Sequence, residues 1–195
     1  MTHDFDRRMA LAGMISLLLP VIPAHARAAK GAAARFPVRL NDLTVMDARS
    51  RARFNLFRDL IRDRVAVISF MFVGCSTICP IQTSILARAQ NLLSSELGKR
   101  IIFASVSISP LLDTPARLVE FADAHGAGAG WHFLRGGIRE TQRLQEGFDS
   151  FAPVRDDHPP VFCIGRASAD RWTRLYGMPK PEQVAREARG WLRVT

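Results

Sequence analysis

The sequence lacks an uninterrupted apolar stretch of the length that a membrane-spanning helix needs. The candidate run, Met9–Ile22, is shorter than the roughly 20 residues of such a helix, and Gly, Ser and Pro residues interrupt it. Arg7 and Arg8 precede the run and Ala24-His25-Ala26 follows it, which is the pattern of a cleavable secretory signal. We therefore expect residues 1–26 to be a signal peptide for export to the periplasm. An uncleaved membrane anchor is the alternative.

Lysine is also scarce, because Lys30, Lys99 and Lys180 are the only three, and the formal net charge of +9 therefore comes almost entirely from arginine. The basic residues are scattered and form no continuous run, which argues against a nucleic-acid partner. Residues 1–26 hold two acidic and two basic residues, so the charge survives their removal. An acidic protein partner, or weak association with anionic lipid headgroups at a membrane surface, remains compatible with this surface.

Cysteine is limited to three residues, an odd number that leaves at least one thiol unpaired. Cys163 lies inside the apolar run Val161–Ile164, which predicts a buried thiol without a chemical role. Cys75 and Cys79 lie four positions apart. In an oxidising compartment such a pair stays reduced only if a metal occupies it or a periplasmic thiol reductant acts on it.

The chain shows no internal repeat and no low-complexity block, and its periodicity indicates one α/β domain. Val65–Val73 and Ile101–Ile108 are almost wholly apolar, which is typical of central parallel strands that are covered on both faces. The order of the elements predicts a thioredoxin-like mixed sheet with helices on both faces over residues 36–195, preceded by a flexible leader at residues 27–35. Further strands are expected at His132–Leu134 and Pro160–Ile164, which pairs with Trp172–Tyr176 as a hairpin, and helices after Pro80, after Thr114, at Ile138–Phe148 and at Pro181–Leu192.

The cysteine pair, in Cys75-Ser-Thr-Ile-Cys79-Pro80, directly follows a predicted central strand and directly precedes a predicted helix. Residues four apart share a face if the turn is helical, so both sulfurs can meet one ion or each other. The positive end of the helix dipole is expected to favour the thiolate at both positions. The pair can therefore bind a soft metal, cycle between dithiol and disulfide, or form a structural disulfide.

Three features together resemble the Sco/SenC family of copper-handling assembly factors for cytochrome oxidase. They are the Cys-x-x-x-Cys-Pro motif after a strand, the segment Val106–Pro115, which is similar to a strand followed by the family's D-P-x-x-D-T-P turn, and Asp157-His158 before an apolar strand and hairpin. They occur in the family's order, and the resemblance covers roughly Phe36 to Leu192. It implies a copper chaperone that serves a respiratory copper protein, such as cytochrome c oxidase, or the assembly factors of that protein.

The resemblance implies Cys75, Cys79 and His158 as metal ligands, with Asp157 and Asp156 orienting or charge-balancing the imidazole. Two thiolates and one imidazole form a soft set that suits Cu(I), and an added oxygen ligand or water extends it for Cu(II). A closed zinc site would require a fourth protein ligand, and no fourth Cys or His lies near these three in sequence.

Two features depart from the simplest copper-chaperone interpretation. Ser109 stands where the family usually has an aspartate near the copper, so an acidic neighbour is expected to be missing. Pro160 begins the strand that should face the cysteines, where thioredoxin-like oxidoreductases keep a cis-proline. The alternative function is therefore thiol–disulfide exchange, in which Cys75 attacks a partner's disulfide and Cys79 resolves the mixed disulfide.

Overall fold

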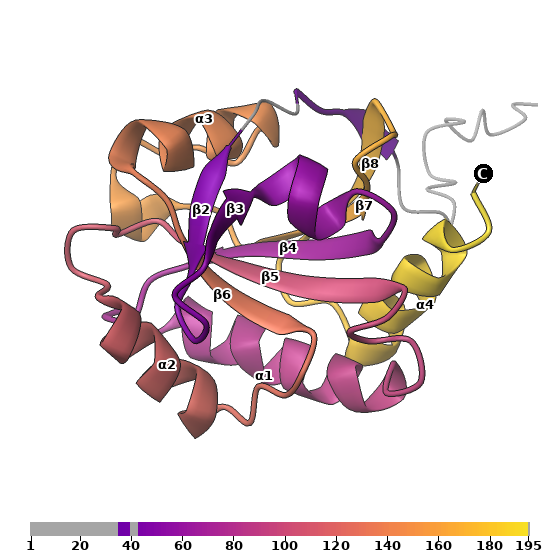
Figure 1. The fold of residues 1–195 in the computed structure, drawn as a ribbon, viewed down its shortest axis with the longest axis horizontal. Helices are drawn as coiled ribbons and strands as arrows, with labels where there is room; N and C mark the ends of the chain where they lie inside the picture. The colour runs from indigo at the N-terminus through magenta and orange to yellow at the C-terminus, as the bar shows by residue number, and fades with distance from the viewer. Residues whose placement is uncertain (1–34, 40–42, 195) are drawn as a thin grey trace, which may run out of the picture. The chain divides into compact units, whose positions relative to one another are not determined.

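The computed structural model describes residues 35–39 and 43–194, which all belong to one unit, residues 33–195. The strands of this part of the chain form one eight-stranded sheet in the order β1-β8-β7-β4-β5-β6-β2-β3 (Figure 1). Their bounds are β1 Arg35–Pro37, β2 Thr44–Asp47, β3 Arg53–Asn55, β4 Val65–Met71, β5 Ile101–Ser107, β6 Trp131–Arg135, β7 Val161–Arg166 and β8 Arg171–Tyr176.

The centre of the sheet consists of β4 and β5, which pair in parallel from Val65 opposite Ile101 to Met71 opposite Ser107. All residues of both strands are buried. Their near-continuous apolar sequence follows from this position, because helices cover both faces. β6 continues the parallel arrangement beside β5, whereas β7 lies antiparallel to β4 on the other side. The carboxyl ends of β4, β5 and β6 and the start of β7 therefore share one edge of the sheet.

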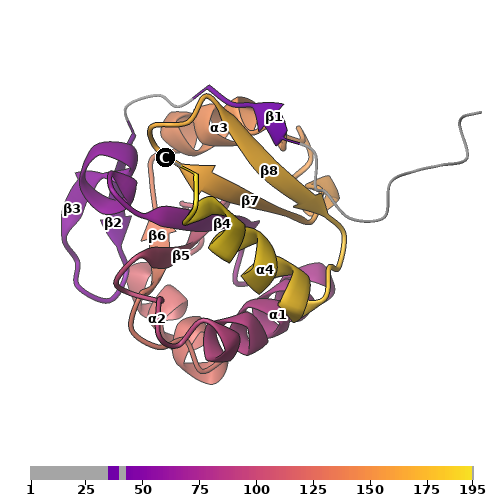
Figure 2. The ribbon, with the colours of Figure 1, turned by 90° about the vertical axis from the view of Figure 1, so that its right-hand side faces the viewer.

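Helices and helical turns cover the two faces. On one face, α1 (Ile78–Leu92), α2 (Pro115–Ala124) and α4 (Pro181–Trp191) pack over an apolar cluster, and Figure 2 shows α4 beside α1. On the other face, a π-helical turn, η2 (Leu56–Ile61), and α3 (Ile138–Gly147) enclose a second cluster. A short 3₁₀ turn, η3 (Arg155–Asp157), precedes β7.

The predicted fold class is confirmed: a mixed sheet carries helices on both faces, and β7 and β8 form the expected antiparallel hairpin. The Thr114 hydroxyl caps α2 by accepting the N–H of Arg117, as the Thr-Pro pair predicts. One boundary was wrong, because α1 ends at Leu92 and not at Gly98; a series of turns leads from there to β5. β1 begins at Arg35, which the sequence placed in the leader.

The predicted signal peptide and nearly all of the predicted leader lie outside the described residues. Within the described ranges, none of the helices combines the length and the hydropathy required to cross a membrane.

Candidate functional site

The two cysteines lie in the turn that leaves β4 and enters α1. The Cys75 N–H donates to the Phe72 carbonyl over 3.2 Å, which folds the turn back on the end of the strand. The Cys75 sulfur in turn accepts the backbone N–H of Cys79 at 3.3 Å. The sulfur thus acts as a cap for the first turn of α1, whose N-cap residue Thr77 makes no side-chain capping bond. Cys75 is half-buried and Cys79 is fully buried, and both are free thiols.

The surroundings of the two thiols shift their pKa values in opposite directions. Partial burial acts to raise the pKa of Cys75, but the N–H groups of the turn and the Cys79 thiol outweigh it, so this pKa lies below its ordinary value of 9.0. Burial raises the pKa of Cys79 to about 12, and the neighbouring Cys75 and Asp113 act in the same direction. The pKa of Cys75 is thus lowered by hydrogen bonds from the turn, whereas burial dominates at Cys79 and raises its pKa.

Asp113 is an acidic neighbour of the cysteines that the sequence analysis did not assign. It is 1% exposed, accepts the Ser107 hydroxyl at 2.6 Å and accepts the Val73 N–H at 3.2 and 3.3 Å on its two oxygens. It thereby ties the turn after β5 to the turn that carries the cysteines. Asp113 corresponds to the second aspartate of the D-P-x-x-D-T-P pattern, and Ser109 stands at the first. The Asp-Thr-Pro sequence before α2 was the available signal.

His158 lies before β7, on the same edge of the sheet as the cysteine turn. Its ring is 3% exposed and packs edge-on against Phe72, with 5.9 Å between the ring centroids. The Arg155 carbonyl accepts from Nδ1 at 2.9 Å, so in the neutral ring Nε2 carries the lone pair. Nε2 is buried and has no hydrogen-bond partner within the described part of the chain. A buried imidazole nitrogen with a free lone pair is suited to a metal ligand.

The structure places the two cysteines in one turn, and the imidazole packs against Phe72 in the segment that leads into that turn. Among residues 35–39 and 43–194, no three His, Cys, Asp or Glu side chains are grouped closely enough to hold a metal ion as they stand. Asp156 and Asp157, expected to orient or charge-balance the imidazole, are both exposed, and the group that bonds Nδ1 is the Arg155 carbonyl. The Asp156 carboxylate instead pairs with the Arg155 guanidinium at 3.2 Å.

Arg155 is a second neighbour that the sequence analysis missed. Its guanidinium lies over the Phe72 ring, 4.3 Å from the centroid, and reaches the Ser109 hydroxyl at 3.5 Å. It therefore places a positive charge on the edge of the sheet where the cysteines lie. The Ser109 hydroxyl contacts the Arg155 guanidinium, but unlike an aspartate it does not neutralise the positive charge.

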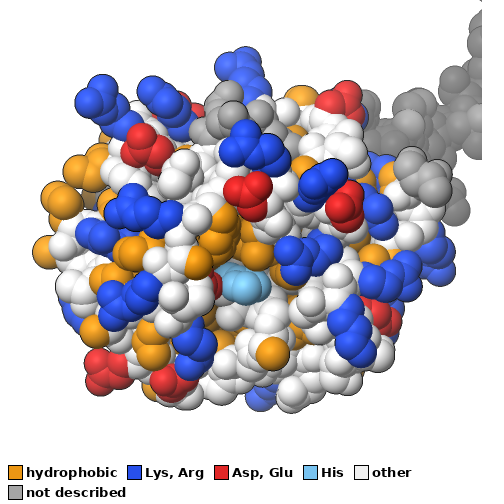
Figure 3. Space-filling model, in the orientation of Figure 1, with side chains coloured by type: hydrophobic (Ala, Val, Ile, Leu, Met, Phe, Trp, Pro, Cys, Tyr) orange, Lys and Arg blue, Asp and Glu red, His pale blue; other side chains and the backbone are white. Residues whose placement is uncertain are grey.

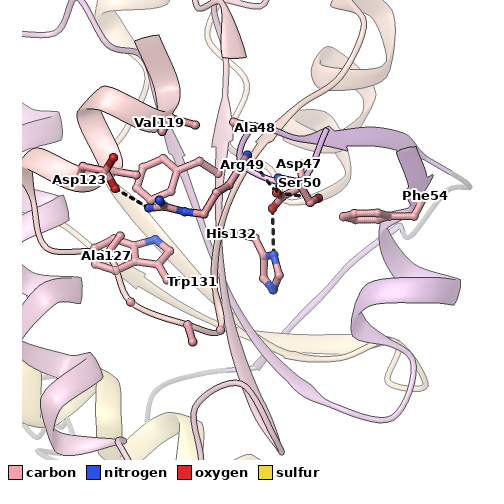
Figure 4. A pocket seen from close by; sticks show the side chains of 15 residues that line it. Asp47, Ala48, Arg49, Ser50, Phe54, Val119, Asp123, Ala127, Trp131 and His132 are labelled. Atoms are coloured by element: carbon pink, nitrogen blue, oxygen red, sulfur yellow. Dashed lines mark hydrogen bonds and ion pairs between the residues drawn. The ribbon is translucent and has the colours of Figure 1, made fainter. Parts of the chain in front are cut away.

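A cavity of about 590 Å³ lies elsewhere, where β6 begins, between the turn after β2 and the end of α2 (Figure 4). Two interactions cross it or line it: Arg49 pairs with Asp123 at 2.7 Å, and His132 Nδ1 meets Asp47 at 2.9 Å. Burial acts to raise the pKa of Asp47, but hydrogen bonds from His132 and Ser50 outweigh it and lower the pKa to about 2. His132 lies within β6, and its ring is held by Asp47.

Cys163 and Pro160 are the remaining positions that the sequence analysis discussed, and His125 is a further histidine of the described residues. Cys163 is fully buried in β7, where burial raises its pKa, and it is not part of the site. His125 forms the C-cap of α2, and its Nδ1 lies 2.8 Å from the Phe121 carbonyl. The peptide bonds of the described residues are all trans, including the one before Pro160, so the cis-proline considered in the sequence is not found there.

Comparison with known proteins identifies the relatives of this arrangement. The family model described as SCO1/SenC matches residues 57–187. No curated protein matches the chain. Among solved structures, a SCO1/SenC family lipoprotein from Bacillus anthracis is 20% identical, with a TM-score of 0.71 over 84% of this chain and 100% of that one.

Two further structures have the same fold. BsSco, described as a member of the Sco family of cytochrome c oxidase assembly proteins, is 18% identical, with a TM-score of 0.71 over 84% of this chain and 99% of its own. ScoI of Arabidopsis thaliana with copper bound is 15% identical, with a TM-score of 0.66 over 80% and 98% of the two chains. At these identities the structures establish the shared fold.

Proposed function

This chain belongs to the SCO1/SenC family, and from that premise we propose that it is a periplasmic copper-binding chaperone that delivers copper to a respiratory copper site. The site of cytochrome c oxidase is the leading candidate for the client. The observation that carries the proposal is the pairing of two free thiols in one turn with a buried imidazole whose Nε2 has no partner. The copper bound in Arabidopsis ScoI and the assembly role given for BsSco support the same interpretation.

The donor set fits a soft ion. Cys75 and Cys79 supply two thiolates and His158 supplies a neutral imidazole nitrogen, a set that suits Cu(I) and can accept a further oxygen ligand for Cu(II). The hydrogen bond from Nδ1 to the Arg155 carbonyl fixes the tautomer that leaves Nε2 available. Binding by all three requires the imidazole and the cysteine turn to approach each other, because the described residues do not hold the three ligands as one group.

The thiol environments set an order of events for copper capture. Cys75 is half-exposed and has the lower pKa, so its thiolate is the group that first meets copper or a donor protein. Cys79 follows, since it releases its proton only when a cation compensates for burial and for the nearby Asp113. Delivery reverses this order by ligand exchange with the client, and no catalytic turnover is needed.

Thiol–disulfide exchange is the second candidate function. The observation that favours it is the asymmetry of the pair, with an exposed thiol of lowered pKa beside a buried thiol of raised pKa. A thiol of lowered pKa suits the cysteine that attacks a partner's disulfide, and a buried thiol beside it suits the cysteine that resolves the mixed disulfide. In that case Cys79→Ser traps a partner covalently through Cys75, and a periplasmic reductant must regenerate the dithiol.

Anaerobic Cu(I) titration of the reduced protein tests the chaperone proposal, with affinity measured against a competing chelator. We expect one Cu(I) per chain, and His158→Ala should weaken binding at least about tenfold by removing one of three ligands. His125→Ala is the matched control, because that histidine caps α2, and it should leave affinity unchanged. Equal affinity in the wild type and in His158→Ala would contradict the three-ligand site. Cell fractionation that recovers the mature chain outside the periplasm would contradict the location.

A further inference from the structure

The turn between β5 and α2 exposes two consecutive leucines beside the cysteines. The side chain of Leu111 is 75% exposed and that of Leu112 is 58% exposed. Asp113 of the same turn accepts the Val73 N–H, so the leucines stand on the edge of the sheet that carries Cys75. Figure 3 shows hydrophobic side chains gathered along the side of the molecule where this turn runs in Figure 1.

Three arginines from separate parts of the chain hold the turn in place. Arg155 reaches the Ser109 hydroxyl at 3.5 Å, Arg135 Nε donates to the Pro110 carbonyl at 2.7 Å, and Arg117 Nη1 donates to the Leu112 carbonyl at 2.8 Å. They come from η3, from the end of β6 and from α2. Within the turn, the Leu112 and Asp113 N–H groups both donate to the Ser109 carbonyl, at 3.0 and 2.8 Å. The leucines are therefore exposed on a turn that is fixed at several points.

Exposed leucines on a fixed turn are favourable for binding. Burial of their apolar area against a partner stabilises a complex, and a turn that is already ordered loses little conformational entropy when it binds. Val154, which precedes Arg155 in the chain, is a further exposed apolar side chain at 57%. Leu111, Leu112 and Val154, together with Arg117, Arg135 and Arg155, are called the leucine–arginine face below.

The charges around this face select the kind of partner. Three guanidinium groups border the leucines, and of the two exposed acids in η3, Asp156 is already paired with Arg155. Each of the three arginines uses only part of its five N–H donors on the turn, which leaves donors for an external acceptor. An excess of positive charge around an apolar centre is complementary to a segment that is apolar with acidic flanks.

We propose that the leucine–arginine face docks the client protein through an apolar segment with acidic flanking residues, and so positions the client's thiols or copper ligands at Cys75. This proposal rests on the proposed function, because it names the kind of surface that the client presents. The same face would serve copper transfer and thiol exchange alike, since both require the client to approach the half-exposed sulfur of Cys75.

Synthetic peptide disulfides test the docking without copper. Each peptide carries one cysteine as a mixed disulfide with thionitrobenzoate, flanked either by Leu and Asp or by Leu and Lys. The Cys75 thiolate of the reduced, metal-free protein attacks the peptide sulfur; a protein–peptide disulfide forms and thionitrobenzoate leaves, which is followed by absorbance. Each rate is divided by the same variant's rate with the mixed disulfide of thionitrobenzoate and cysteamine, whose carboxylate and ammonium give no net charge, so that changes in the reactivity of Cys75 cancel.

We expect the wild type to react about tenfold faster with the Asp peptide than with the Lys peptide at low salt, and the preference to fall as salt rises. Leu111→Ser combined with Leu112→Ser should slow the Asp-peptide reaction about tenfold. Arg117→Glu should remove most of the preference. Leu92→Ser, on an exposed leucine of α1, and Arg62→Glu, before β4, are the controls and should behave as the wild type.

Two results would overturn the proposal: equal rates of the wild type with the two peptides, or a preference that the leucine and Arg117 variants leave intact. Sedimentation of the wild type and of the double leucine variant tests whether a second copy of the chain occupies the face. A wild-type dimer that the leucine substitutions dissociate would assign the face to self-association and would also overturn the docking proposal. Copper titration is independent of these measurements. A chain that binds no copper yet keeps the preference would refute the proposed function and leave the docking surface established.

Discussion

The clearest test of the site is the difference in ionisation between its two thiols. A pKa of about 12 leaves about one Cys79 thiol in ten thousand ionised at pH 8, against about one in ten for a thiol at the ordinary 9.0. Cys75, whose pKa lies below 9.0, is ionised more often than that reference. Because only the thiolate is alkylated, Cys79 should react with iodoacetamide at least about a thousandfold more slowly than Cys75 at pH 8.

The assay is pulsed alkylation of the reduced, metal-free protein with isotope-coded iodoacetamide, followed by peptide mass spectrometry across a pH series. The rate at Cys75 should reach half of its plateau value at a pH below 9, whereas the rate at Cys79 should still rise tenfold per pH unit at pH 10. Cys163, fully buried in β7, reports global unfolding in the same sample. Addition of one Cu(I) per chain should protect Cys75 and Cys79 and leave Cys163 unchanged.

The reasoning would be refuted if Cys79 were alkylated as fast as Cys75 at pH 8 while Cys163 stayed protected. That result would mean that the turn opens readily and that burial does not control the second thiol. A Cys75→Ser variant separates the causes of the shift, because it removes the neighbouring sulfur and leaves the burial. Reactivity of Cys79 should then increase only modestly, since burial is the largest contribution.

Two further predictions concern the scaffold. Asp47→Asn should lower the free energy of unfolding by about 2 kcal/mol at pH 7, because the pKa of Asp47 is 3.8 when unfolded and about 2 when folded. That contribution is complete above about pH 5 and is lost as the pH falls through 2, so urea unfolding of the wild type and the variant should converge in acid. Gly130→Ala should cost more than about 2 kcal/mol, since its φ is +86° and a Cβ would collide with the Gly98 backbone. Gly126→Ala, at φ +66° with open space around it, is the control; thermal unfolding should show a loss of only about 1 kcal/mol.

The elements that the sequence predicted well are those whose local pattern and tertiary position agree. The apolar runs of β4 and β5 could only be satisfied at the centre of a sheet, and Thr114-Pro115 defines a helix start without help from the rest of the fold. The end of α1 was less predictable, because Leu93 is still buried at helical spacing after the helix has ended. The helical spacing of apolar residues continues into the turns after Leu92, so the sequence pattern does not show where α1 ends.

The sequence predicted the turn that carries the two cysteines, and it missed the contacts that surround the candidate site. The spacing of Cys75 and Cys79 before a helix is a local signal, and the structure places both in one turn. The carbonyl that orients His158 belongs to Arg155, and a backbone acceptor leaves no trace in the sequence because any residue type provides it. The sequence therefore favoured the neighbouring carboxylates, Asp156 and Asp157, which the fold leaves in solvent.

Under the proposed function, the position of Asp113 connects copper binding to proton release. Its carboxylate is buried beside Cys79, so in the metal-free protein it disfavours a second negative charge there. A bound cation reverses the balance, because the same carboxylate then attracts the ion that the thiolate holds. Copper binding and ionisation of Cys79 should accordingly occur together, and Cu(I) affinity should increase with pH throughout the range in which Cys79 of the metal-free protein is protonated. The Asp113 carboxylate thus destabilises the Cys79 thiolate in the metal-free protein and stabilises the complex of that thiolate with a bound copper ion.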